Sequence, residues 1–190
     1  MSDVEPVLLP QWSAELTTRS GIKLDIRPAS PDDELLLIDF FRKLTPDDLR
    51  FRFLSSMKEV GPSLAHQLVD VDHSRTEDLL AFDERDRSLV ATAMIAADPD
   101  LQRAEVAIAV RSDRKGEGIG WSLLRHACDY AAARGIRRVE SIESSQNRPA
   151  ISLETELGFA AKPYDGDATL TLVTMDLQSD ARTRGQSPRA

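Results

Sequence analysis

Residues 105–120, EVAIAVRSDRKGEGIG, decide the fold because they combine a strand, a glycine-rich turn and the start of a helix. Val106, Ile108 and Val110 alternate with alanines, which is the two-residue period of a strand. Glycines then occupy every second position from 116 to 120, and glycine lets the backbone turn tightly without a Cβ clash. The following run, WSLLRHACDYAAARG, places its apolar residues on one face of a helix.

The helix that starts inside this turn is expected to bind a phosphate group. The first amides of a helix have no partner within it, and the helix dipole puts partial positive charge at the same end. Amides grouped in this way bind a phosphate or a pyrophosphate. We therefore predict a phosphate-bearing cofactor at residues 116–120.

Two other phosphate-binding motifs fit the turn less well. A dinucleotide-binding fold needs GxGxxG directly after the strand, whereas here residues 111–115 intervene and the spacing is GxGxG. Glu140 is a nominal acidic ribose ligand at the usual distance, but its strand lacks the rest of that fingerprint. A Walker A loop needs Lys-Ser/Thr after its second glycine, and this sequence does not supply it.

The segment Lys115-Gly116-Glu117-Gly118-Ile119-Gly120 resembles the acyl-CoA loop of the GNAT N-acetyltransferase superfamily, Q/R-x-x-G-x-G/A. A second segment, NRPAISLETELGF at residues 147–159, resembles the helix N-x-x-A-x-x-L-Y-x-x-x-G-F of the same family. The resemblance covers about residues 22–177. The sequence departs from the family pattern at Lys115, where arginine or glutamine is usual, and at the acidic Glu117. We therefore expect weaker or altered cofactor affinity.

The resemblance implies an α/β (α+β) fold with one domain. Its central sheet is mixed and mostly antiparallel, helices flank it, and splayed strands form the acyl-CoA cleft. It also implies acetyl-CoA, or another acyl-CoA, as cofactor. The cofactor-binding residues that follow from it are Ile108, Ala109, Val110, Lys115, Gly116, Glu117, Gly118, Ile119, Gly120, Trp121 and Asn147.

Acyl transfer to an amine needs a base, because an alkylamine has a pKa near 10.4 and attacks only when neutral. Glu105 is the first choice, since it shares its strand face with Ala107 and Ala109, whose small side chains leave room for a ligand. A solvated surface glutamate is the alternative reading of Glu105. Glu143, at the end of the next strand, is the second choice.

The general acid is open, because the tyrosine that usually protonates the leaving thiolate falls at Glu154. Tyr164 and Ser152 are other donors. This departure keeps a second function in view, a catalytically weak acyl-CoA-binding regulator or sensor. Asn147 is expected either to contact the pantetheine arm of the cofactor or to cap the N-terminus of the following helix.

The stretch LTPDDLRFRFLSS at residues 44–56 resembles the bacterial protein lysine acetyltransferase branch of the family. The strand AEVAIAV at residues 104–110 recurs in that branch, with a glutamate assigned as general base. Arg50 and Arg52 alternate with phenylalanines, which favours an amphipathic helix on the acceptor side of the cleft over a nucleic-acid contact.

Composition agrees with one soluble domain. The chain has 190 residues, 41% of them hydrophobic, and a net charge of −8, which argues against nucleic-acid binding and suits a cationic acceptor. Cys128 is the only cysteine, which favours a cytoplasmic location, and the three histidines show no metal-ligand spacing. No apolar run is long enough for a membrane span. The acceptor, a protein lysine or a small molecule, stays open, as does a homodimer.

We expect residues 1–21 to form a flexible arm, residues 22–177 the acyltransferase domain and residues 178–190 a disordered tail. Within the domain, the periodicities predict strands at 22–27, 78–83, 89–97, 105–110, 138–143 and 170–177, and helices that begin near Ser30 or Asp32, Thr45, Pro62, Gly118 and Asn147.

Overall fold

The computed structural model describes residues 12–177, and the predicted tail at residues 178–190 lies outside the described residues. One sheet runs through the described part in the order β1-β2-β3-β4-β5-β6-β8-β7. In chain order the elements are β1 (Ala14–Thr17), β2 (Lys23–Pro28), η2 (Pro31–Asp33), α1 (Glu34–Phe41), α2 (Pro46–Phe53), α3 (Pro62–Val69), β3 (Thr76–Asp83), β4 (Leu89–Ala97), β5 (Arg103–Val110), η3 (Ser112–Arg114), α4 (Ile119–Ala133), β6 (Arg138–Ser144), α5 (Arg148–Glu156), β7 (Ala160–Tyr164) and β8 (Asp167–Asp176).

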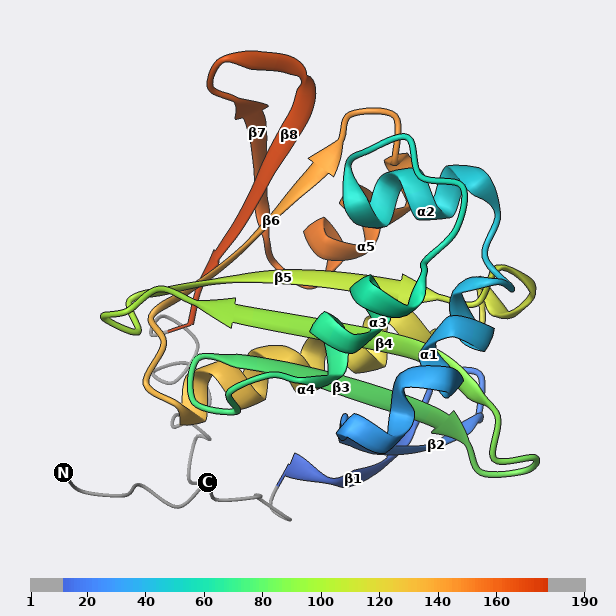
Figure 1. Ribbon diagram of the computed structural model, residues 1–190. Helices are drawn as coiled ribbons and strands as arrows, with labels where there is room; N and C mark the ends of the chain where they lie inside the picture. The colour runs from blue at the N-terminus through green and yellow to red at the C-terminus, as the bar shows by residue number, and fades with distance from the viewer. Residues whose placement is uncertain (1–11, 178–190) are drawn as a thin grey trace, which may run out of the picture.

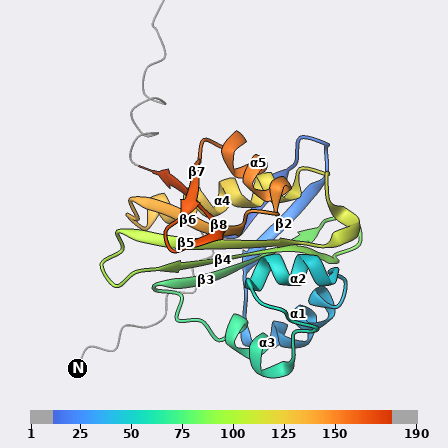
Figure 2. The same cartoon turned by 90° about the horizontal axis from the view of Figure 1, so that it is seen from above.

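Helices cover both faces of the sheet (Figure 2): α1, α2 and α3 lie on one face and α4 and α5 on the other. The alternation along β3 shows why both faces are apolar. Leu79 and Ala81 join the core under α4, whereas Leu80 and Phe82 join the core under α1 to α3. The predicted fold, a mixed and mostly antiparallel sheet flanked by helices, is confirmed.

The start of α2 shows how local sequence sets a helix boundary. Thr45 is the N-cap, and its side chain accepts a hydrogen bond from the backbone N–H of Asp48 at 3.2 Å. Pro46 follows at the first helical position, where the missing N–H costs nothing. The predicted helix after Thr45 is therefore confirmed.

The parallel pair β5 and β6 separates soon after it begins. Only Arg103, Ala104 and Glu105 pair with β6, opposite Arg138, Val139 and Glu140. Beyond these pairs β6 turns away from β5 and continues with the β7–β8 hairpin (Figure 1). The backbone groups of β5 after Glu105 that face β6 therefore lack a strand partner on that side.

Two strands lie where none was predicted. β1 forms within the predicted flexible arm and pairs antiparallel with β2, from Ala14 opposite Ile26 to Thr17 opposite Lys23. The arm prediction is therefore wrong for this segment, and residues 1–11 lie outside the described residues. β7 pairs with β8 although its sequence, AAKPY, contains a proline, which an edge strand tolerates.

Candidate functional site

A cleft of about 730 Å³ opens where β5 and β6 separate. One wall is β5 from Glu105 to Val110, and the opposite wall carries Ile142 and Glu143 of β6 with part of α5. The residues of α2 from Phe51 onward line another side. All predicted site residues except Glu117 line this one cleft: Glu105, Ile108, Ala109, Val110, Lys115, Gly116, Gly118, Ile119, Gly120, Trp121, Glu143 and Asn147.

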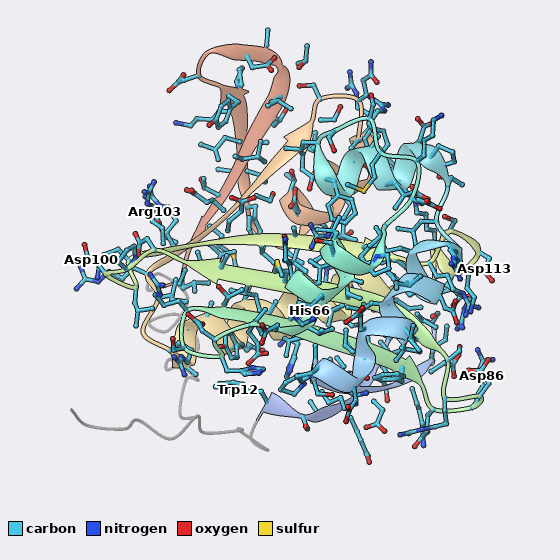
Figure 3. All side chains as sticks on the ribbon, viewed as in Figure 1. Trp12, His66, Asp86, Asp100, Arg103 and Asp113 are labelled. Atoms are coloured by element: carbon cyan, nitrogen blue, oxygen red, sulfur yellow. The ribbon has the colours of Figure 1, made fainter. Side chains whose placement is uncertain are left out.

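The glycine loop forms the end of the cleft that follows β5. Figure 3 labels both ends of this strand: Arg103 marks its start, and Asp113 lies beyond its other end, in the loop. Glu105 precedes Val110 by five residues, so at a rise of 3.3 Å per residue it lies about 17 Å from the strand's loop end. The cleft therefore has a loop end and a Glu105 end.

The three glycines of the loop serve two different purposes. Gly116 and Gly118 both have φ +78°, a left-handed conformation that a residue with a Cβ adopts only under strain. Gly120 has no such φ, but a Cβ there would lie 3.3 Å from side-chain atoms of both Leu153 and Val110. Gly120 therefore lets the start of α4 pack closely against β5 and α5.

The N-terminus of α4 is suited to an anion. Its N-cap, Gly118, offers no side-chain cap, and the first turn contains no acidic residue. The helix runs for 15 residues, which gives a full dipole. A phosphate group that accepts hydrogen bonds from the amides at Ile119 to Trp121 fits this arrangement, so the loop meets the chemical requirement of a CoA pyrophosphate.

Cationic side chains surround the loop end. Arg114, Lys115 and Arg19 all line the cleft. The Arg19 guanidinium lies 4.0 Å from the ring centroid of Trp121 and forms an ion pair with Glu156. Arg19 belongs to the segment after β1 that was assigned to a flexible arm, so the sequence analysis missed it.

Arg114 binds the side chain of Glu117. Arg114 Nε donates to Glu117 Oε2 at 2.7 Å, and Arg114 Nη2 donates to the buried Asp83 carboxylate at 2.7 Å. Arg85 also bonds Asp83 and, with Arg114, holds the pKa of that carboxyl well below its usual range, against the effect of burial. Glu117 itself is not among the residues that line the cleft, so its predicted contact to the cofactor stays a prediction.

Lys115 connects the loop to α2. Its ammonium group bonds Asp48, and Ser112 Oγ donates to the same carboxylate. Burial favours the neutral acid, but these hydrogen bonds outweigh it and hold the pKa of Asp48 below its ordinary value. The lysine that replaces the family's arginine or glutamine thus has a defined role in fixing α2 against the loop.

At the far end of the cleft, Glu105 is exposed and lies on the wall that β5 contributes. Its strand neighbours follow the predicted alternation: Val106 is buried in the core on the α4 side, and Ala109 is buried on the α2 side. Glu105 therefore projects on the side of α2, where Ala107 leaves space beside it.

Two carboxyl groups, those of Glu143 and Glu154, lie in the wall formed by β6 and α5, and the charge of Glu154 acts on Glu143. Burial, and then the nearby charge of Glu154, raise the pKa of Glu143 to about 8. Burial also raises the pKa of Glu154 to about 7, despite a hydrogen bond donated by Ser141 Oγ. Glu154 Oε2 is buried without a hydrogen-bond partner in the described part of the chain. At neutral pH this pair therefore retains protons.

Asn147 occupies the N-cap position of α5, but its side chain does not cap the helix. Instead its Nδ2 donates to Glu143 Oε2 at 2.7 Å. Of its two predicted roles, the side-chain cap is therefore wrong, and its position in the cleft wall leaves a contact to the cofactor as a prediction.

The α2 wall carries Arg52, beside Phe51 and Phe53. Its Nε and Nη2 atoms are buried and, among the described residues, have no hydrogen-bond partner. Burial lowers its pKa, and the charges of Asp78, Glu105 and Glu143 act in the opposite direction. The prediction that α2 is an amphipathic helix lining the cleft agrees with this arrangement.

Comparison with known proteins identifies the family. The model of the acetyltransferase (GNAT) family matches residues 38–159. The chain belongs to this family. A curated relative, acetyltransferase PA5475 of Pseudomonas aeruginosa, is 32% identical over 146 residues, which is 76% of this chain and 78% of the relative. The prediction of a GNAT N-acetyltransferase that uses acetyl-CoA is confirmed.

Solved structures share the fold of this acetyltransferase. The GNAT domain of PAT from S. lividans superposes with a TM-score of 0.82 at 22% identity, over 88% of this chain and 98% of that domain. Spermidine N-acetyltransferase from Vibrio cholerae, in complex with CoA and spermine, superposes with a TM-score of 0.67 at 14% identity, over 82% of this chain and 96% of that one. Within residues 12–177, no helix is both long and apolar enough to span a bilayer.

The raised pKa of Glu154 predicts how stability depends on pH in this acetyltransferase. The unfolded carboxyl has a pKa of 4.5 and the folded one about 7, so the folded state holds the proton more tightly. Its contribution to stability is therefore complete below pH 4.5 and is lost as the pH rises through 7. At about 1.4 kcal/mol per pKa unit, the Glu154→Gln variant should gain about 3 kcal/mol relative to wild type between pH 4 and pH 8.

Urea unfolding at both pH values measures this difference, and Glu59→Gln, at an exposed glutamate, is the control. We expect the control to show no such pH dependence. An equal stability difference for Glu154→Gln at pH 4 and pH 8 would contradict the buried, protonated carboxyl.

Proposed function

We propose that this acetyltransferase transfers an acetyl group from acetyl-CoA to a primary amine, and that the Glu105 carboxylate accepts the amine proton. The observation that carries the proposal is that Glu105 and the glycine loop belong to one cleft, opened by the separation of β5 from β6. A donor that extends from the loop along β5 would bring its reactive end towards Glu105.

The loop end would hold the phosphate groups of the donor. The amides at the start of α4 would donate hydrogen bonds to the pyrophosphate, and Arg19, Arg114 and Lys115 would supply positive charge. When bound, the cofactor supplies an acetyl thioester whose carbonyl carbon a neutral amine attacks. The unpaired amides of β5 near Ile108 to Val110 would stabilise negative charge on the carbonyl oxygen.

Glu105 suits the role of base better than Glu143 does. Glu105 is exposed in the cleft, so water and an acceptor can reach its carboxylate. Glu143 has a pKa of about 8 because of its burial, so it is largely protonated at neutral pH and unable to accept a proton there. Glu143 is retained as the second choice for alkaline conditions.

Glu154 would supply the proton that the leaving thiolate needs. Its Oε2 atom is buried and has no hydrogen-bond partner within residues 12–177, and its pKa of about 7 leaves the carboxyl protonated in a large fraction of molecules at neutral pH. A proton donor with a pKa near the working pH is the most effective kind. We propose this role for Glu154 in place of the tyrosine usual in the family.

The acceptor is an amine, and two sources compete. The resemblance of residues 44–56 to the bacterial protein lysine acetyltransferases favours a protein lysine, and the Vibrio cholerae enzyme with bound spermine favours a small polyamine. A regulatory acyl-CoA-binding protein is a second candidate function, favoured by the glutamate at position 154.

The test pairs calorimetry of CoA binding with thiol release from acetyl-CoA over a panel of lysine peptides, polyamines and amino acids. Binding together with turnover of any amine supports the proposal. Tight CoA binding without turnover of any acceptor would favour the regulator, and the absence of CoA binding would overturn both functions.

A further inference from the structure

Arg52 is a partly buried cation in the cleft wall, and none of the described residues forms an ion pair with it. The guanidinium atoms Nε and Nη2 are shielded from solvent and have no hydrogen-bond partner among the described residues. A buried charge is costly unless it is paired and hydrogen-bonded. The ring of Phe53, whose centroid lies 4.9 Å away, stabilises the charge but accepts no hydrogen bond in the plane of the guanidinium.

The acidic groups around Arg52 do not neutralise it fully. Asp78, Glu105 and Glu143 are the three carboxyl groups whose charge acts on it. Burial raises the pKa of Asp78 to about 7 and that of Glu143 to about 8, so both are protonated to a large extent at neutral pH. The exposed Glu105 is the remaining carboxylate, and it is the base of the proposed reaction.

The donor's phosphates belong elsewhere. They require the glycine loop, whereas Arg52 acts on Glu105, which lies about 17 Å along β5 from the loop end at 3.3 Å per residue. Arg52 also lies one turn or more beyond Asp48, the α2 residue that contacts the loop. The anion that Arg52 lacks is therefore a group near the reacting amine.

We propose that Arg52 binds a carboxylate on the acceptor, so that the preferred acceptor is a free amino acid, whose amine and carboxylate share one carbon. This inference rests on the proposed function. A carboxylate on the guanidinium of Arg52 would place the attached amine next to Glu105. Nη1 is the guanidinium nitrogen that is not shielded, so it would donate the charged hydrogen bond to this carboxylate.

The rest of the α2 wall favours an apolar amino acid side chain. Phe51, Phe53 and Leu54 line the cleft beside Arg52, and Leu54 is 40% exposed. A polyamine offers no anion to Arg52 and would bring like charge to it. The side chains around Arg52 therefore favour amino acids over polyamines as acceptors.

The experiment measures release of the CoA thiol with the 20 common L-amino acids, each beside its amide and its decarboxylated amine. We expect kcat/KM for the best amino acid to exceed that for its amide and for its decarboxylated amine by roughly 10- to 100-fold. The difference should come from a lower KM, because charged hydrogen bonds contribute about this much to binding. The Arg52→Met variant should lose this preference, with kcat/KM for the amino acid falling to that for its amide. Arg50→Gln is the matched control, since Arg50 bonds Asp47 and Gln146 and does not line the cleft.

Three outcomes would overturn the inference. Amides, polyamines or lysine peptides could be the better acceptors in wild type, or no amino acid could be turned over. Arg52→Met could change kcat/KM by the same factor for all acceptors, which is the result expected if Arg52 has only a structural role beside Asp78. Lastly, an Arg52-dependent preference for succinyl-CoA over acetyl-CoA would assign the carboxylate to the acyl group instead. If wild type acetylates only lysine peptides, the inference about Arg52 fails but the proposed acetyltransferase function holds. If wild type does not bind CoA, the proposed function fails as well.

Discussion

Glu105→Gln is expected to lower kcat by ~10²–10⁴-fold and to leave CoA affinity unchanged, because the amide cannot accept the amine proton. Glutamine keeps the size of the side chain, and Glu105 lies at the far end of the cleft from the glycine loop. Steady-state kinetics with an excess of acceptor, together with calorimetry of CoA binding, measures both quantities.

Glu140→Gln is the matched control for this prediction. Glu140 is paired with Glu105 across the parallel strands β5 and β6, but it does not line the cleft. The control should keep wild-type turnover. Near-normal turnover in Glu105→Gln would remove Glu105 as the base and transfer the role to Glu143, whose pKa of about 8 predicts activity that rises with pH up to that value.

Gly118→Ala is expected to weaken CoA binding by roughly 10- to 100-fold. A side chain in the left-handed conformation costs about 1–3 kcal/mol, which the loop relieves by moving its amides out of position. The φ of +78° at Gly118 is the origin of this cost, since the added Cβ itself meets Thr18 only at an ordinary 3.5 Å.

Gly135→Ala separates the effect on binding from the effect on stability. Gly135 follows α4, has φ +81°, and a Cβ added there meets no atom within 4 Å. Both variants should therefore lose similar thermal stability, and only Gly118→Ala should lose CoA affinity in calorimetry. Equal CoA affinity in the two variants would count against the loop as the phosphate site.

Local patterns predicted the elements whose boundaries depend on neighbouring residues. Thr45 and Pro46 define the start of α2, and the alternation from Val106 to Val110 defines β5. β7 escaped prediction because AAKPY shows no alternation, and it becomes a strand only by pairing with β8. β1 likewise depends on β2 for its hydrogen bonds.

The candidate site divides in the same way. Glu105 and the glycine loop could be located from their own sequence, because a strand alternation and glycine spacing are local signals. The environment of Arg52 and Glu154 could not, because it is built from segments far apart in the chain. The arginine–phenylalanine alternation did indicate that α2 faces a cleft, but not that two guanidinium nitrogens of Arg52 have no hydrogen-bond partner in the described part of the chain.

The sequence by itself determined the family, the donor and the residues of the loop, because these follow from short motifs in a fixed order. Only the tertiary structure decided which charges are buried. Burial raises the pKa of Glu143 and Glu154, hydrogen bonds turn Glu117 towards Arg114, and the separation of β5 from β6 opens the cleft. Each of these depends on solvent exclusion and distance between elements, which no local pattern of residues records.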